Sequence, residues 1–102
     1  MSDYCNASTE RLFRTLANVQ TPEECRALLE DLCTVREIQD MAQRLDTAIL
    51  LDQGVNYQKI VERVGVSTAT ISRVNRCLQY GSNGYRTAID RMAETEKTYE
   101  SQ

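Results

Sequence analysis

A run of small and hydroxyl-bearing residues carries side chains that suit contact with nucleic acid. Hydroxyl groups can donate to phosphate oxygens or base edges, methyl groups can contact thymine methyls, and guanidinium groups bind guanine or phosphate. Small side chains would also let a helix enter a major groove, and its free amides would favour a nearby phosphate. The run consists of Ser67, Thr68, Ala69, Thr70 and Ser72, and the arginines Arg73 and Arg76 follow it.

Two short helices joined through a glycine would present this run. Asn56 can cap the first helix and Ser67 the second, and a valine before each cap can pack on an isoleucine beyond it. Gly65 lies between the helices, where a left-handed conformation would let the chain reverse. The pattern predicts a helix-turn-helix over residues 56–78, although a pair of ordinary capped surface helices is the alternative. The apolar residues at helical spacing are Ile60, Val61, Val64, Ile71, Val74 and Leu78.

Three further amphipathic helices are predicted upstream, over residues 6–52. Thr21 and Thr34 can each cap a helix, with Glu24 and Glu37 three residues later to close a capping box. Gly54 is expected to end the third helix. Because strand-like alternation is absent, the sequence predicts an all-α protein. The stripes expected to be buried are Leu12, Phe13, Leu16 and Val19; Cys25, Leu28, Leu29 and Leu32; and Ile38, Met41, Leu45 and Ile49.

Length and charge narrow the classes of protein. The chain has 102 residues and a formal net charge of −3, and we expect a single domain over residues 1–102. Residues 56–92 contain six basic and two acidic residues, whereas residues 1–55 contain five and ten. A concentrated positive segment of this kind suits a nucleic-acid partner despite the acidic whole. A solvated surface is the alternative.

Catalysis, metal binding and membrane insertion are not expected. The chain has no histidine, which excludes His-dependent triads and mixed Cys/His zinc sites. Its four cysteines, Cys5, Cys25, Cys33 and Cys77, form no C-x-x-C motif, and we expect them to be reduced and mostly buried in a cytoplasmic protein. The longest apolar run is far too short to cross a bilayer, and the N-terminus lacks the pattern of a secretory signal.

Two segments of the chain resemble the Trp repressor family, most closely its TrpR-related branch of YerC/YecD-type proteins. They are LCTVREIQDMAQRL, at residues 32–45, and VGVSTATISRVNRCL, at residues 64–78. The resemblance extends over roughly residues 8–92 in helix order. It implies an all-α, six-helix Trp repressor-like fold that exists as an intertwined homodimer. The dimerisation helices would span residues 6–52, the helix-turn-helix 56–78, the C-terminal helix 82–97 and a tail 98–102.

The resemblance also implies which residues contact DNA. The family's contacts at the start of the recognition helix match Thr68, Ala69, Thr70 and Ser72. Arg76 stands where the tryptophan-responsive repressor has asparagine, and Gln58 and Val61 stand where it has basic residues. These departures suggest a different operator. The full set of candidate DNA-binding residues is Gln58, Ser67, Thr68, Ala69, Thr70, Ser72, Arg73 and Arg76.

The corepressor site of the family is only partly retained. Thr34, Arg44 and Arg73 match residues that surround tryptophan in the tryptophan-responsive repressor, but Val74 replaces a glycine at the floor of the indole slot. The valine would occupy the volume that an indole needs, so tryptophan is not expected as a cofactor. Another small effector remains open. Alternatively, Thr34 only caps a helix while Arg44 and Arg73 pair with acidic residues across the dimer.

These observations favour a sequence-specific DNA-binding transcriptional regulator that binds the major groove of double-stranded DNA as a homodimer. Repression is the expected direction. The main alternative is a helical protein–protein interaction module without DNA binding. A recombinase or sigma-like factor would need a further region for which 102 residues leave no room. No enzyme constellation is present, because Glu23, Glu24, Glu30 and Asp31 fit helix starts and exposed faces.

Overall fold

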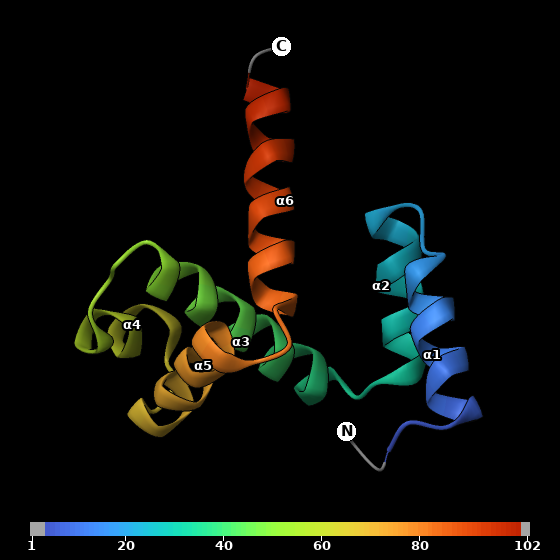
Figure 1. The fold of residues 1–102 in the computed structure, drawn as a ribbon, viewed down its shortest axis with the longest axis horizontal. Helices are drawn as coiled ribbons and strands as arrows, with labels where there is room; N and C mark the ends of the chain where they lie inside the picture. Colours follow the sequence, from blue (N-terminus) through green and yellow to red (C-terminus); the bar gives the residue numbers. More distant parts are fainter. Residues whose placement is uncertain (1–3, 101–102) are drawn as a thin grey trace. The chain divides into compact units, whose positions relative to one another are not determined.

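The computed structural model describes the backbone of residues 4–100 and the side chains of residues 4–95. This part of the chain contains six α-helices and no strand, which confirms the predicted all-α, six-helix fold. The helices divide between two compact units, Met1–Ile38 and Gln39–Gln102, whose boundary falls inside α3. The helices are α1 (Ala7–Ala17), α2 (Pro22–Leu32), α3 (Val35–Asp52), α4 (Tyr57–Val64), α5 (Thr68–Tyr80) and α6 (Gly84–Glu100), as labelled in Figure 1.

Side-chain caps begin the helices of the N-terminal unit. The Thr34 hydroxyl accepts a hydrogen bond from the Glu37 amide at 3.1 Å, and the Glu37 carboxylate accepts one from the Thr34 amide at 2.8 Å. The bond that the carboxylate accepts from the Thr34 amide, followed by the interaction with the Thr34 side chain, lowers the pKa of Glu37. The Thr21 side chain accepts from the Glu24 amide at 3.1 Å. Among the described residues no return bond comes from Glu24, so only half of that predicted box forms.

The expected burial of the N-terminal apolar stripes does not occur within one chain. Neither α1 nor α2 contains a buried residue. Phe13 is 45% exposed and packs edge-on against Tyr4. Leu12, Leu16 and Leu32 are also exposed. A single chain therefore does not bury these stripes, and much of their apolar surface stays in contact with water.

The prediction that most cysteines are buried is wrong. All four are free thiols, with Cys5 and Cys77 exposed and Cys25 and Cys33 half-buried. The three in the N-terminal unit stay accessible because that unit buries none of its helical residues. Cys77 of α5 is exposed even though it lies one helical turn after the buried Val74.

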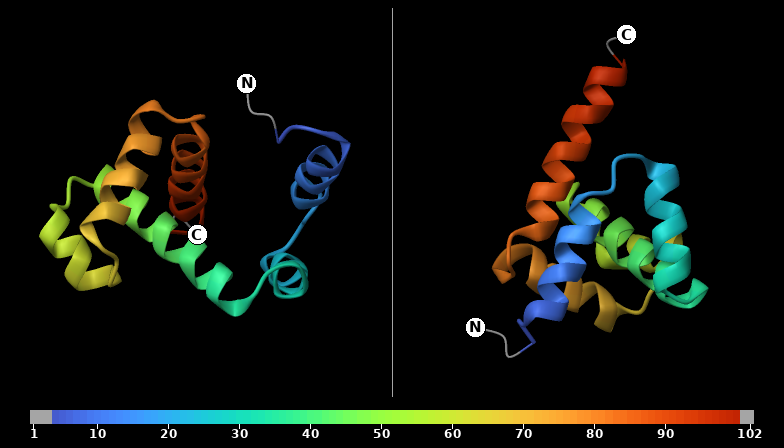
Figure 2. Two further views of the ribbon diagram at one scale, coloured as in Figure 1. Left: turned by 90° about the horizontal axis from the view of Figure 1, so that it is seen from below. Right: turned by 90° about the vertical axis from the view of Figure 1, so that its right-hand side faces the viewer.

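The C-terminal unit has a core of its own, formed by two neighbouring clusters. In the first, Val74 of α5 packs with Ala48 of α3 and Ile89 of α6. Among the described residues α5 packs against both α4 and α6, and the left view of Figure 2 shows it between these two helices. The small residues Thr47 and Ala48 give α3 its completely buried surface. The second cluster consists of Ile60, Val66 and Ile71, with Leu50, Leu51, Val55, Val61 and Val64 packed around it.

The turns between α3, α4 and α5 form as the sequence predicts. Gly54 and Gly65 have φ angles of +80° and +83°, in the left-handed region where glycine carries no Cβ penalty. Asn56 caps α4 by accepting from the Lys59 amide at 2.9 Å. Ser67 caps α5 by accepting from the Thr70 amide at 3.2 Å. Because each signal acts within a few residues, the local sequence is sufficient to shape this hairpin.

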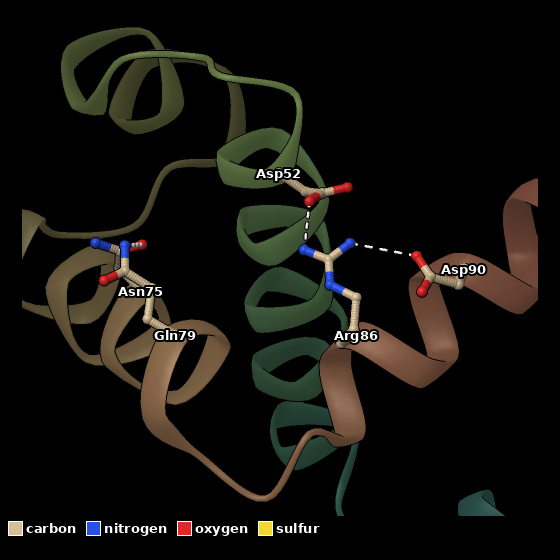
Figure 3. Close-up of polar contacts among 5 residues, drawn as sticks. All are labelled: Asp52, Asn75, Gln79, Arg86 and Asp90. Atoms are coloured by element: carbon tan, nitrogen blue, oxygen red, sulfur yellow. Dashed lines mark hydrogen bonds and ion pairs between the residues drawn. The ribbon is translucent and has the colours of Figure 1, made fainter.

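The C-terminal helix differs in length from the prediction. It begins at Gly84 rather than at residue 82 and continues to Glu100, so residues 98–100 of the expected tail are helical, while 101–102 lie outside the described residues. Arg86, near its start, is paired with Asp52 at the end of α3 and with Asp90 at 3.2 Å (Figure 3). Hydrogen bonds to Asp52 and Asp90 raise the pKa of Arg86. The ion pair to Asp52 thus joins the first turn of α6 to α3.

No helix in the described part of the chain is long and apolar enough to cross a membrane.

Candidate nucleic-acid interface

The outer face of α5 collects most of the predicted DNA-binding residues. The inner face of the helix carries Ile71 and Val74, which are buried, and Leu78, which packs beside them. Thr70 is half-buried at the edge of that face. Since α5 is anchored by buried aliphatic residues on one side, its opposite side is presented on a rigid support. The residues exposed there or at the start of the helix are Ser67, Thr68, Ala69, Ser72, Arg73 and Arg76.

Two hydroxyl groups at the start of α5, those of Ser67 and Thr70, are joined by a hydrogen bond. Ser67 Oγ lies 3.1 Å from Thr70 Oγ1, in addition to the bond that it accepts from the Thr70 amide. Ser67 therefore has a capping role in this structure, and its hydroxyl is shared with Thr70. The side chains of Thr68, Ala69 and Ser72 are exposed beside this pair. They form the small, polar leading edge that a groove-binding helix needs.

A hydrogen bond between α4 and α5, which the sequence analysis did not predict, fixes the second half of α5. The Asn75 side-chain amide donates to the Tyr57 hydroxyl at 3.3 Å, and Gln79 donates to the Asn75 carbonyl oxygen at 3.2 Å. Figure 3 shows Asn75 and Gln79 together on α5. The bond joins side chains 18 positions apart, so no local spacing rule could have identified it.

The residues expected to contact DNA from α4 divide into two kinds. Gln58 is exposed, whereas Val61 is half-buried against the cluster that contains Ile60. Lys59 and Arg63 are exposed basic residues of α4 that the sequence analysis did not single out. Their i, i+4 spacing on a basic segment was a signal that could have identified them. They are candidates for phosphate contacts.

A cavity of about 290 Å³ lies between α3 and α5. A second, of about 350 Å³, adjoins it and shares Arg44, Arg73 and Val74 in its wall. These volumes fall near the lower limit of small-molecule sites. Asp40, Gln43, Val66 and Thr70 complete the first cavity, and Met41, Cys77 and Tyr85 complete the second.

The candidate effector residues are partly brought together. Arg44 and Arg73 line both cavities, and within the described residues neither has an ion-pair partner in the same chain. Val74 is 2% exposed because it packs on Ala48 and Ile89. Thr34 belongs to the N-terminal unit, where its side chain caps α3. Among the described residues no group of His, Cys, Asp and Glu could hold a metal ion.

Comparison with known proteins gives a consistent set of matches. The model of the family described as Trp repressor protein matches residues 7–93. The uncharacterized protein YerC of Bacillus subtilis (strain 168) is 49% identical over 87 residues, which cover 85% of this chain and 84% of YerC. A solved structure described as a candidate Trp repressor from Staphylococcus aureus shares 44% identity, with a TM-score of 0.83, over 87% of this chain and 89% of that one. A TrpR-like protein from Eubacterium eligens ATCC 27750 shares 39% identity, with a TM-score of 0.83, over 86% and 91%.

Proposed function

Since the chain belongs to the Trp repressor family, we propose that it is a sequence-specific DNA-binding regulator of transcription that acts as a repressor. The predicted resemblance in residues 32–45 and 64–78 is confirmed by the family match. Members of this family are regulators, and we propose that this chain likewise has no catalytic activity. Double-stranded DNA is the partner. A cytoplasmic location stays a prediction.

The observation that carries this proposal is the exposed outer face of α5 on a buried support. Residues that can donate to phosphate or base edges cover that face, while Ile71 and Val74 hold the inner face in the core. Helices α4 and α5 together contain four basic residues and one acidic residue, Glu62. This excess of positive charge supports a polyanionic partner. The proposed contacts are Gln58, Ser67, Thr68, Ala69, Thr70, Ser72, Arg73 and Arg76.

The regulator acts as a homodimer. What supports this proposal is the large amount of apolar surface that the single chain leaves open, including Phe13, Leu32 and Val35. A soluble domain rarely keeps contiguous apolar stripes in water, and a second copy would cover them. Two copies would also present two recognition helices, which suits a pseudo-palindromic operator. The proposal includes the intertwined arrangement that the resemblance implies. It also includes a single domain over residues 1–102 whose apolar core is completed by the partner copy.

No corepressor is required for DNA binding. The packed position of Val74 against Ala48 supports this proposal, because a filled slot gives the helix permanent support. Arg44 and Arg73 still border a cavity of about 290 Å³, so a small effector other than tryptophan is the second possibility. Either group could instead pair with an acidic residue of the partner copy.

Selection of duplexes from a random pool tests the proposal directly. We expect a pseudo-palindromic sequence to be enriched by the protein alone, and to the same extent when an amino-acid mixture is present. Enrichment only with the mixture would show that an effector is required. If no duplex is retained even at low salt, where phosphate contacts are strongest, the chain is a protein-interaction module and not a DNA-binding regulator.

Substitution of Arg76 should distinguish base contact from phosphate contact. If its guanidinium binds a guanine edge, Arg76→Ala should cost about 1–3 kcal/mol of binding free energy and relax the preference at one base pair. If it binds phosphate, every duplex should weaken alike and the salt slope should fall by about one. Thr70→Ala should mainly alter sequence preference. Titrations of both variants against selected and scrambled duplexes measure this, and unchanged binding in both would mean that α5 is not the recognition helix.

A further inference from the structure

We propose that Tyr80, at the C-terminal end of α5, donates its hydroxyl to a phosphate of the bound DNA, so that the interface extends along the whole outer face of the helix. The inference rests on the proposed function. No motif of the sequence analysis included Tyr80, and the candidate contacts ended at Arg76. Its side chain is 83% exposed, which makes it the most exposed large apolar or aromatic residue in the described part of the chain.

The spacing of the exposed residues places Tyr80 on the proposed DNA-binding face. Ala69, Arg73, Arg76 and Tyr80 follow one another at intervals of four, three and four residues, so they share one side of the helix. All four are exposed. They lie opposite the side that Ile71, Val74 and Leu78 turn toward the core.

The polar residues between them are occupied elsewhere. Asn75 donates to Tyr57 of α4, and Gln79 donates to Asn75. The second half of α5 is therefore divided into a side bonded to α4 and a side that is open to a ligand. Among the described residues, neither Arg76 nor Tyr80 has a hydrogen bond or ion pair through its side chain. Both are available for contacts outside the chain.

The end of the helix is fixed at Tyr80. The Gly81 amide donates to the Cys77 carbonyl at 2.9 Å, which closes the last turn. A Cβ at Gly81 would lie 2.4 Å from that same carbonyl oxygen, so only glycine fits there without displacing the backbone. Tyr80 is thus held in the last turn of a regular helix, and its distance from the first turn is set by helix geometry.

That distance exceeds the width of a major groove. The eleven steps of α-helix from Ala69 to Tyr80 extend about 16 Å, whereas the groove is about 12 Å wide. If Thr68 and Ala69 face base edges, Tyr80 lies near the rim of the groove, where sugar and phosphate are the accessible groups. Tyrosine hydroxyls are regular donors to phosphate oxygens. Helix α5 contains two arginines and no acidic residue, so its charge is complementary to the backbone.

The test is the Tyr80→Phe variant, which removes one hydroxyl and keeps the ring. Affinity for the selected duplex should fall about 12- to 160-fold, the range expected for one hydrogen bond to a charged group. Scrambled duplexes should weaken by the same factor, because phosphate carries no sequence information. The salt slope should remain that of the wild type, since a neutral hydroxyl releases no counterion, in contrast to a phosphate-bound Arg76.

Tyr4→Phe is the matched control, because Tyr4 is an exposed tyrosine of the N-terminal unit and loses the same group. It should bind every duplex as the wild type does. Wild-type binding by Tyr80→Phe, or a loss confined to one base pair, would overturn the assignment of Tyr80 while leaving the proposed function intact. A wild-type protein that retains no duplex would refute both. Both variants should melt at the wild-type temperature, because each hydroxyl is at the surface.

Discussion

The melting temperature of the wild-type protein is expected to rise by about 3–6 °C for each tenfold increase in its concentration. For a dimer that has no stable monomer, a tenfold rise in concentration increases the free energy of unfolding by about 1.4 kcal/mol. In a protein of about 200 residues, each kcal/mol raises the melting temperature by about 2–4 °C. The expectation follows from α1 and α2, which bury no residue within one chain. Calorimetry over two decades of concentration measures it.

Substitution in α1 should show whether its exposed apolar residues hold two copies together. Phe13 is 45% exposed in the single chain, and Phe13→Asp would place a charge where a partner copy removes water. We expect the variant to lose the dimer in sedimentation at micromolar concentration. Ser8→Asp adds the same charge to the same helix at another exposed position, and it should remain dimeric. A folded wild-type monomer of 11.6 kDa at micromolar concentration would refute the homodimer.

Replacement of Val74 is expected to have the second large effect. Val74 is 2% exposed and packs on Ala48 and Ile89, so Val74→Gly removes buried methyl groups and puts glycine inside α5. Together these changes should lower the free energy of unfolding by about 2–4 kcal/mol. DNA affinity should fall as well, because α5 would lose the contact that joins it to α3 and α6.

The same substitution tests the proposal that Val74 fills the volume that tryptophan would need beside Arg44 and Arg73. The wild-type protein should bind its operator equally well with and without tryptophan, whereas Val74→Gly should reveal weak tryptophan binding beside Arg44 and Arg73. Val74→Ala opens nearly as much space without placing a glycine inside the helix. It therefore distinguishes the effect of the added space from the effect of glycine on the helix backbone. Isothermal calorimetry on all three proteins measures this. Micromolar binding of tryptophan to the wild type, coupled to tighter DNA binding, would refute the filled-slot hypothesis.

The helix-turn-helix could be predicted from the sequence because its signals are local. Asn56, Gly65 and Ser67 each act on the few residues that follow or precede them, and the structure forms all three as expected. The same holds for the reciprocal bonds between Thr34 and Glu37. A capping side chain needs only a neighbouring backbone amide, so no knowledge of the tertiary fold is required.

Burial and long-range bonds could not be predicted in the same way. The stripe through Met41 and Leu45 is exposed in the single chain, whereas Thr47 and Ala48 are the residues of α3 that become completely buried. An apolar period identifies a face that avoids water, but it does not say whether the same chain or another copy covers that face. The bond between Tyr57 and Asn75 depends on how α4 and α5 cross, and no spacing rule encodes that angle.

The confinement of the core to one part of the chain has a consequence for how such proteins diverge. Every completely buried residue lies between Thr47 and Ile89, within the described part of the chain. Substitutions among the exposed apolar residues of α1 therefore leave this core unchanged. Changes in free energy from substitutions at sites that share no contact partners are additive. Under the proposed function, two descendants of one gene can thus acquire subunits that no longer exchange with each other while both keep the ancestral operator.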